Sequence, residues 1–392
     1  MSAVLPVHFD PASPDFTEDP YEIYCHLRRS APVLPFEYED NAYWILSRYE
    51  DIARAVVTWR DYTVAKGVLI QDSPQRAGYS LATIDPPRHE ELRRVYARAF
   101  TAERIHATEG DARRHARSLI DNFRDRRSFD LVEDFAKPLF NRAIGSVIGI
   151  HQQDQDSVLT LLADVYSESS PFGAPIKFAA LPALNKFMLD QVKSRETGDR
   201  NDLMSVLYQA HTESTFASEQ EIATASVGVL LAGFSTTIHQ LGNLIAALES
   251  HPDQRHTLVK DLSFAPAAVE EGARYDTAGH AFARSATCDL NVAGVTIPAG
   301  GRVVLLYASA NRDEDAIPEA DRYDLGRKAV RHFGFGSAPH FCLGAPLARF
   351  LLKVAIEELL PVLGDRYKLD RDTAIRPVNL SARGYDYLHV TF

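Results

Sequence analysis

Cysteine is scarce in this sequence, with three residues in a chain of 392. Cys25, Cys288 and Cys342 lie far apart and form no Cys-x-x-Cys pair. This spacing argues against a disulfide framework and against a cysteine-based zinc site, because both need several cysteines at short separations. The scarcity of cysteine also indicates a reducing compartment.

Long apolar runs and an excess of positive charge are missing too. No run approaches the roughly 20 apolar residues of a membrane span, and residues 1–10 have neither the basic patch nor the apolar core of a signal peptide. The net charge of −11 argues against general nucleic-acid binding. The composition is that of a soluble globular protein. We therefore expect a cytoplasmic protein without a nucleic-acid or membrane partner.

The most informative stretch runs from Phe335 to Arg349 and reads F-G-S-A-P-H-F-C-L-G-A-P-L-A-R. A turn rich in glycine and proline places Cys342 at the start of an amphipathic helical pattern. Backbone N–H groups at a helix start, together with His340 and Arg349, are expected to favour the thiolate, which ligates metals and attacks electrophiles. The residues alone leave several roles open: nucleophile, zinc ligand, haem ligand or buried apolar cysteine.

A capping box at Ser218 and Glu221 opens a helix that is expected to reach about Leu248. The pattern is apolar on nearly all sides, which predicts a buried helix. Its A-G-F-S-T-T stretch, from Ala232 to Thr237, combines glycine with hydroxyl side chains that cost helix stability and can bend the helix through the preceding carbonyls. Alone, the stretch is compatible with a packing notch.

Two other patterns place charged residues on one helix face. The D-P-P sequence that begins at Asp85 predicts a helix start in which Asp85 accepts the first N–H groups, and His89 and Arg93 follow four residues apart. Glu271 and Arg274 share a face of a second helix, where a surface ion pair contributes little to stability. Taken alone, both patterns are compatible with solvated faces.

The remaining chain predicts mainly helices. Nearly continuous helical patterns cover residues 101–250, with breaks near Arg127, His151, 171–175, Gly198 and Thr215. The other expected elements are helices over 21–29, 49–57 and 267–274, strands over 42–47, 284–290, 295–297 and 302–307, and short strands in the tail 366–392. The irregular stretch 64–83 is of a length more often functional than not.

The cysteine stretch resembles the haem-binding loop of the cytochrome P450 family, in which the thiolate is the proximal ligand of haem iron. Phe335, Gly336, His340, Cys342 and Gly344 match that loop. The D-P-P-x-H-x-x-x-R, A-G-F-S-T-T and E-x-x-R patterns are similar to further family motifs, in the family's order. The resemblance implies a mainly α fold, a single large helical domain over residues 1–392 with minor β-sheets.

The resemblance also implies a role for each motif. Cys342 would ligate the iron of haem b (iron protoporphyrin IX), and Thr236, with Ser235 before it, would serve proton delivery to dioxygen. Glu271 and Arg274 would form a structural pair that a third arginine completes, for which Arg322 is the candidate. The other residues implied in haem binding are His89, Arg93, Ala232, Gly233, Arg284, His340 and Gly344.

Two positions depart from the family pattern. Ala338 stands where the family usually has glycine, and it is expected to tighten the turn because alanine resists positive φ. Ser235 stands where an acid usually precedes the threonine, and a serine passes protons only along hydrogen bonds. Two other functions therefore stay open: a peroxide-using, coupling or rearranging haem-thiolate enzyme, and a non-enzymatic haem-binding sensor.

The activity that the resemblance implies is a monooxygenase, which inserts one oxygen atom from O2 into a small hydrophobic or aromatic substrate by hydroxylation or oxidative demethylation. Electrons would come from a ferredoxin and ferredoxin reductase or a similar donor, and we expect a monomer.

A lid over 167–175 would cover the substrate pocket. The residues expected to line it are Phe172, Gly228, Leu231, Ala281, Phe282 and Tyr385. A basic set is interpreted either as the face that docks the donor or as solvated surface: Arg88, Arg94, Arg98, Lys328, Arg331, Arg349 and Lys353.

Overall fold

The computed structural model describes residues 9–72, 80–166, 171–172, 177–194, 202–213, 215–216 and 218–392. Helices predominate among them. They are α1 (Pro14–Glu18), α2 (Tyr21–Ser30), α3 (Tyr49–Val57), α4 (Arg88–Ala97), α5 (Ala102–Ala107), α6 (Glu109–Asp121), α7 (Lys137–Ile148), α8 (Gln155–Val165), α9 (Leu181–Lys193), α10 (Leu203–Thr212), α11 (Glu219–Phe234), α12 (Thr236–Ser250), α13 (Pro252–Lys260), α14 (Ala265–Tyr275), α15 (Tyr307–Ala310) and α16 (Ala345–Leu363).

The strands form small sheets. They are β1 (Val33–Tyr38), β2 (Asn41–Leu46), β3 (Tyr62–Thr63), β4 (Ser128–Asp130), β5 (Ala281–Ala286), β6 (Leu290–Val292), β7 (Val295–Ile297), β8 (Arg302–Leu306), β9 (Lys368–Ile375) and β10 (Tyr387–Thr391). The largest sheet has the order β1-β2-β8-β5-β3, in which β2 pairs with β8 in parallel and Tyr43 lies opposite Arg302. A second sheet has the order β4-β10-β9, and β6 pairs with β7.

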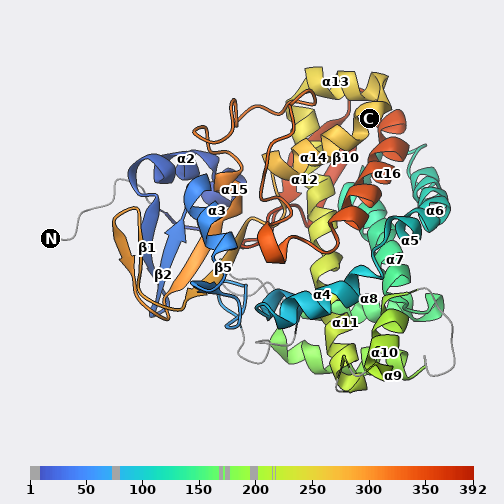
Figure 1. Ribbon diagram of the computed structural model, residues 1–392. Helices are drawn as coiled ribbons and strands as arrows, with labels where there is room; N and C mark the ends of the chain where they lie inside the picture. Colours follow the sequence, from blue (N-terminus) through green and yellow to red (C-terminus); the bar gives the residue numbers. More distant parts are fainter. Residues whose placement is uncertain are drawn as a thin grey trace.

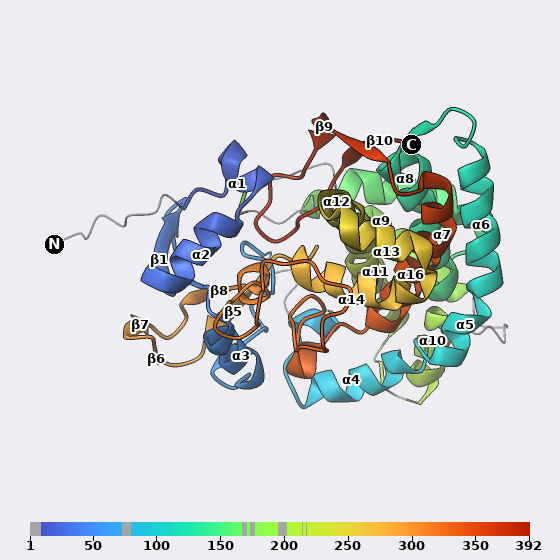
Figure 2. The same cartoon turned by 90° about the horizontal axis from the view of Figure 1, so that it is seen from above.

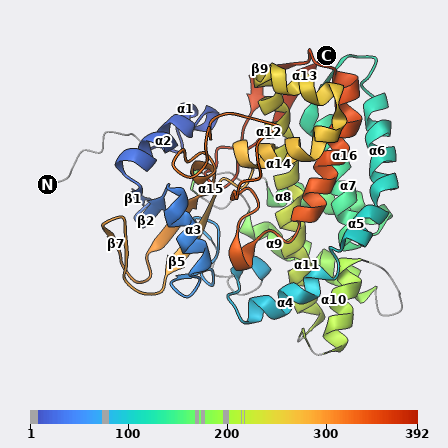
Figure 3. The ribbon, with the colours of Figure 1, turned by 45° about the horizontal axis from the view of Figure 1, so that its top comes forward.

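Two regions lie side by side in Figure 1. The largest sheet, with α2 and α3, forms one region, and the helices from α4 to α14, together with α16, form the other. Viewed from above, α11 and α12 lie inside the helical region while α6 runs along its outer side (Figure 2). Figure 3 shows the segment before α16 passing between the sheet region and α11. The fold is therefore mainly α with a few small sheets, as predicted.

Local sequence explains several element boundaries. Asp40 and Glu39 take positive φ of 61° and 47° between β1 and β2, the conformation of a two-residue hairpin turn. Ser218 caps α11 by accepting the Glu221 N–H at 3.2 Å. On α6, Ala112, Ala116 and Ile120 recur every four residues and are buried.

The long apolar helix that the sequence predicted is divided in two. Ser235 ends α11 and begins α12, and the Thr236 hydroxyl donates to the Ala232 carbonyl at 2.9 Å. This is the bend through a preceding carbonyl that the hydroxyl residues predicted. By length and composition the stretch Glu219–Ser250 is apolar enough to cross a membrane, but 56% of its most apolar window is buried inside the protein. Core helices show the same pattern.

Most other predicted elements are confirmed within a few residues. The helices over 21–29 and 49–57 and the strand over 295–297 match α2, α3 and β7. The strand predicted over 284–290 is wrong in extent, because β5 ends at Ala286 and β6 begins at Leu290. Strands β1, β3 and β4 were not predicted. β3 and β4 are two or three residues long and pair with strands far along the chain, so tertiary packing defines them. β1 pairs with its neighbour β2, but its proline conceals it as a strand in the sequence.

The capping role predicted for Asp85 is wrong. Its carboxylate accepts the Thr63 hydroxyl and the Val64 N–H instead, while its carbonyl accepts the His89 N–H at 3.2 Å. Asp85 therefore ties the start of α4 to β3, and it holds the helix that carries His89 against the sheet. Except for Pro171 and Phe172, the predicted lid over 167–175 lies outside the described residues.

Candidate functional site

Cys342 lies in the turn that leads into α16. Its N–H donates to the Phe335 carbonyl at 2.8 Å and closes the loop. Backbone N–H groups of Gly344 and Ala345 bond to the sulfur, as a helix start predicts. Ala338 turns the chain with a φ of 55°. Ala338 thus adopts the positive φ that alanine resists, and the expected tightening of the turn stays a prediction.

The charges around Cys342 differ from the prediction. Burial raises the pKa of its thiol, and this effect outweighs the two N–H groups, Arg93 and Arg349, which lower the pKa. His340 supplies no charge at neutral pH, because burial and its cationic neighbours lower its pKa to about 3. The loop by itself therefore does not favour the thiolate. A metal cation bound to the sulfur would, because coordination deprotonates a thiol.

Exposed positions inside the helical region mark an internal space. Cys342 is exposed although protein surrounds most of it, which is expected of a sulfur at the wall of a recess. Ala232 and Thr236 are exposed as well, although their neighbours Leu231 and Thr237 are buried. Gly233 is half-buried, and a side-chain carbon at this position would touch Ile144 at 3.3 Å. The two segments that carry the predicted motifs thus both border open space.

Four cationic or titratable side chains gather beside this space. The rings of His89, on α4, and His340, in the cysteine loop, lie 4.4 Å apart. Burial, Arg284, His89 and Arg93 lower the pKa of His340, and burial and Arg93 lower that of His89. Repulsion among them shows that positive charge dominates here. The structure therefore brings together all four residues that were predicted to bind propionates.

The unpaired polar atoms of this group fit an anionic cofactor edge. Among the described residues, both ring nitrogens of His89 and Nε2 of His340 are buried without a hydrogen-bond partner. Such atoms cost free energy unless a partner is supplied. Haem propionates would supply carboxylate oxygens to these donors, and an iron beside Cys342 would take its sulfur. The residues present therefore fit haem.

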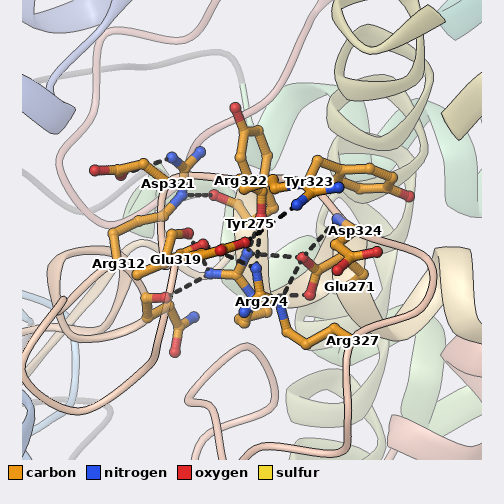
Figure 4. Close-up of polar contacts among 12 residues, drawn as sticks. Glu271, Arg274, Tyr275, Arg312, Glu319, Asp321, Arg322, Tyr323, Asp324 and Arg327 are labelled. Carbon is orange, nitrogen blue, oxygen red and sulfur yellow. Dashed lines mark hydrogen bonds and ion pairs between the residues drawn. The ribbon is translucent and has the colours of Figure 1, made fainter. Parts of the chain in front are cut away.

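The pair Glu271–Arg274 is buried rather than at the surface (Figure 4). Arg274 donates to both Glu271 oxygens at 2.8 Å and to the carbonyls of Asn311, Ala320 and Arg322. The N–H groups of the Arg274 guanidinium are thus satisfied by carboxylate and carbonyl oxygens, as a buried charge requires.

The third arginine is Arg327, so the assignment of Arg322 is wrong. Arg327 Nε donates to Glu271 Oε1 at 2.9 Å, and its other nitrogens bond to the carbonyls of Pro318, Glu319 and Arg322. The Arg322 side chain points outward and pairs with Glu319, with both groups more than half exposed. Only its carbonyl belongs to the cluster. The sequence offers two arginines, Arg322 and Arg327, as the third member of the cluster. Only the path of the folded chain determines which of them reaches Glu271.

The residues predicted to line a substrate pocket are not all brought together. Gly228 and Leu231 lie on α11, where a side-chain carbon at Gly228 would meet Ser80 at 3.2 Å. Ala281 is fully buried, and the Phe282 ring lies 5.4 Å from that of Tyr307. Gly228 and Leu231 thus lie on α11 and Ala281 and Phe282 on β5, and their contacts do not define a substrate.

Phe172 and Tyr385 lie elsewhere, and for them the predicted placement is wrong. Phe172 is buried among aromatic rings of the β1–β2 hairpin, 5.0 Å from Phe36 and 4.6 Å from Tyr38. Tyr385 packs against Gly242 on α12, and its ring lies 3.9 Å from the Arg376 guanidinium. Aromatic rings gain more from these dry contacts than from lining an open space, and the sequence does not reveal the partners.

Comparison with known proteins agrees with this geometry. The sequence profile described as Cytochrome P450 matches residues 180–363. The chain is 35% identical to the mycinamicin IV hydroxylase/epoxidase of Micromonospora griseorubida over 86% of each chain, and 34% identical to the vitamin D(3) 25-hydroxylase of Pseudonocardia autotrophica over 88% of this chain and 86% of that protein. The Bacillus subtilis bacillaene polyketide synthase cytochrome P450 PksS has a similar fold, with a TM-score of 0.87 and 26% identity over 98% of this chain and 99% of that one. The chain therefore belongs to the cytochrome P450 family and is a monooxygenase that depends on haem iron.

Proposed function

We propose that the protein inserts one oxygen atom from O2 into a hydrophobic substrate, with haem b held between Cys342 and α11. One observation carries this proposal: an accessible sulfur at the start of α16 lies near buried histidine nitrogens that have no partner among the described residues, beside two arginines. The sulfur would bind an iron, and the histidine and arginine donors would bind carboxylates. Haem carries both groups, its iron and its propionates.

When bound, haem supplies the redox chemistry that activates dioxygen, and the chain supplies orientation and protons. His89, Arg93, Arg284 and His340 would hold the propionates through charge-assisted hydrogen bonds. The small, exposed Ala232 would leave room beside the cofactor, and Gly233 allows close packing against Ile144. The Thr236 hydroxyl, which donates to Ala232, would hold a water in reach of the reacting atoms. Ser235 would extend that hydrogen-bond chain.

Replacing Cys342 by alanine tests the ligand. We expect the purified variant to lose the carbonyl-adduct spectrum of a thiolate-bound haem, because no other sulfur is available at the loop. The matched control is Cys288→Ala, since Cys288 is exposed in the segment after β5 and its removal should leave the spectrum unchanged. A Cys342→Ala protein that keeps an unaltered spectrum would disprove the assignment.

We further propose that the substrate is a small hydrophobic or aromatic molecule. The apolar Leu231 and the small, exposed Ala232 on α11 support this class. The relatives are named for a macrolide and for a vitamin, so the screen should include macrolides and sterol-like compounds beside small aromatics and terpenoids. A substrate is recognised by a saturable spectral shift of the haem. Hydroxylation and oxidative demethylation are then distinguished by mass analysis of the product.

A ferredoxin with its reductase is the proposed electron donor, and the monomer in the cytoplasm is the proposed working form. Part of the basic set is neutralised at the surface: Arg349 pairs with Glu270, Lys353 with Glu357, Arg88 with Glu91 and Arg98 with Glu213. Docking would therefore depend on the remaining members, Arg94, Lys328 and Arg331. Reduction by an acidic ferredoxin should slow as ionic strength rises. A rate that ignores salt would contradict docking on this face.

Ser235 favours one alternative, a haem-thiolate enzyme that uses peroxide or couples and rearranges its substrates. The hydroxyl at the α11–α12 junction cannot change charge as a carboxylate does. Comparing turnover driven by peroxide with turnover driven by ferredoxin distinguishes the two reactions. Oxygen consumption that depends on substrate would exclude a haem-binding sensor.

A further inference from the structure

A small cavity lies between the N-terminal helix α1 and the C-terminal segment that precedes β10. Its volume is about 20 Å³, and its wall includes Phe16, Thr17, His280, Arg376, Arg383 and Gly384. A cavity of this size holds one water molecule or an ion of similar size. It is separate from the cysteine loop and from α4, which carry the haem-binding residues.

Positive charge dominates the wall of the cavity. Arg383 is fully engaged: its Nε donates to Asp276 at 2.9 Å, and its other nitrogens donate to the carbonyls of Thr17 and Glu18 at 2.7 Å. Asp276 is buried, and its one negative charge faces two guanidinium groups, because Arg376 lies in the same wall and also interacts with it. Among the described residues, the wall itself is lined by both arginines and by no carboxylate.

Arg376 keeps one donor for a ligand. Its two terminal nitrogens donate to the Gly384 carbonyl and to the Tyr385 hydroxyl. Among the described residues its buried Nε has no hydrogen-bond partner, and the Glu18 carboxylate, 68% exposed, lies 3.7 Å away. Burial and repulsion from Arg383 lower the pKa of Arg376 and outweigh the attraction of Tyr385, Asp276 and Glu18.

His280 presents a second donor. The side chain is 2% exposed, its Nδ1 lies 3.2 Å from the Tyr24 hydroxyl, and its Nε2 has no partner among the described residues. The buried Tyr24 hydroxyl has no other acceptor among its described contacts, and a buried donor needs one, so it donates to Nδ1. Burial lowers the pKa of His280 to about 3, so the ring is neutral. The ring hydrogen is therefore on Nε2, at the cavity wall.

We propose that this cavity binds one small monovalent anion of about the size of chloride, between His280 Nε2 and Arg376 Nε. Two donors without a described partner, one of them on a guanidinium, and a wall lined by two arginines and no carboxylate favour an anion over a neutral water. The anion would join α1, β5 and the C-terminal segment, which lie far apart in sequence. This property goes beyond the proposed monooxygenase activity and does not depend on it.

Thermal unfolding of the full-length, haem-loaded protein tests the site. Chloride is titrated against gluconate at constant ionic strength, because gluconate is too large for the cavity. We expect the midpoint of unfolding to rise with chloride and to saturate. Arg376→Gln should raise the chloride Kd about tenfold or more, the effect of losing one charge-assisted hydrogen bond. The matched control is Arg371→Gln on β9, whose side chain is 40% exposed and pairs with Glu249. It should keep the response.

Equal responses of the wild type and Arg376→Gln, or equal effects of chloride and gluconate on the wild type, would overturn the proposal. Crystals of the wild type soaked in bromide give a second measurement that does not depend on whether the variant folds. An anomalous peak between His280 and Arg376 is expected. A soaked crystal without a peak at this position would also overturn the proposal.

Discussion

At the scale of single residues, the methyl group of Ala338 makes the conformation of the cysteine loop cost free energy. Ala338 has a φ of 55°, where a residue with a Cβ is disfavoured by roughly 1–2 kcal/mol. The family's usual glycine adopts this conformation freely. The surrounding loop, closed by the bond between Cys342 and Phe335, holds the alanine in place.

Ala338→Gly is expected to stabilise the protein. Glycine removes the free-energy cost of positive φ, but it also makes the unfolded chain more flexible, which favours unfolding. The first effect is larger, so the free energy of unfolding should rise by about 0.5–1 kcal/mol. Denaturant titration measures it. Ala143→Gly, in the middle of α7, is the control with the opposite sign, because glycine costs about 1 kcal/mol in a helix interior. A loss of stability in Ala338→Gly would show that the loop does not strain the alanine.

Ser235 is the second residue at which this chain departs from its family. The residue ends α11 and begins α12, directly before Thr236. A carboxylate at this position would exchange protons by changing its charge. We expect Ser235→Asp to raise the fraction of consumed electrons that is recovered as product, measured as product formed per reducing equivalent. Ser235→Asn has a similar shape without the charge and serves as its control. Identical coupling in all three proteins would exclude a proton-relay role for the position.

At the scale of structural elements, the Glu271–Arg274–Arg327 cluster joins α14 to the irregular segment before the cysteine loop. Glu271 accepts from both arginines and from the Asp324 N–H at 3.0 Å. These contacts fix the path of a segment that carries no helix or strand of its own between α15 and the turn Ala338–His340. The cluster therefore positions the chain that leads to Cys342.

Arg327→Gln is expected to lower the free energy of unfolding by about 2–3 kcal/mol, because it removes a charged partner from a buried carboxylate. Haem content should fall with it, since the cysteine loop follows this segment. Arg322→Gln is the matched control: its exposed pair with Glu319 is worth at most about 1 kcal/mol. If Arg322→Gln proves the more damaging of the two, the assignment of the third arginine to Arg327 is incorrect.

At the scale of the whole molecule, buried groups with lowered pKa values make stability depend on pH. His280 has a pKa of about 3 in the folded protein, against an ordinary value near 6.5. Between these values the unfolded chain binds a proton that the folded chain does not, so stability falls as the pH falls from about 6.5 to 3. Burial opposes ionisation of Glu270, but hydrogen bonds from His332 and Arg349 hold its pKa at about 2. Its contribution is therefore lost between about pH 4.5 and 2.

His280→Gln should flatten the upper part of this profile. One proton fewer is taken up on unfolding, which changes the slope by up to about 1.4 kcal/mol per pH unit between pH 6 and 4. Unfolding free energies across this range give the slope. Glu270→Gln is the control, since it should leave the profile above pH 5 unchanged and flatten it only at lower pH. An unaltered slope in His280→Gln would mean that the histidine is protonated in the folded protein.

The sequence by itself determined the chemistry at the centre of this protein. The turn and helix start around Cys342, the hydroxyl-rich stretch around Thr236 and the pair His89 and Arg93 are local patterns, because each depends on residues within one or two turns of the chain. Local patterns also sufficed for the helical class of the fold and for most helices, since hydrophobic periodicity is written into a single element.

Only the tertiary structure decided how distant side chains pair. It selected Arg327 over Arg322, placed Phe172 among the rings of the β1–β2 hairpin, turned Asp85 toward Thr63 and brought His280 to Arg376. It also raised the pKa of Cys342, which the sequence was expected to lower, because burial depends on what packs against a residue and not on its neighbours in sequence. Contacts between remote segments depend on the path of the whole chain, and no short stretch of sequence specifies that path.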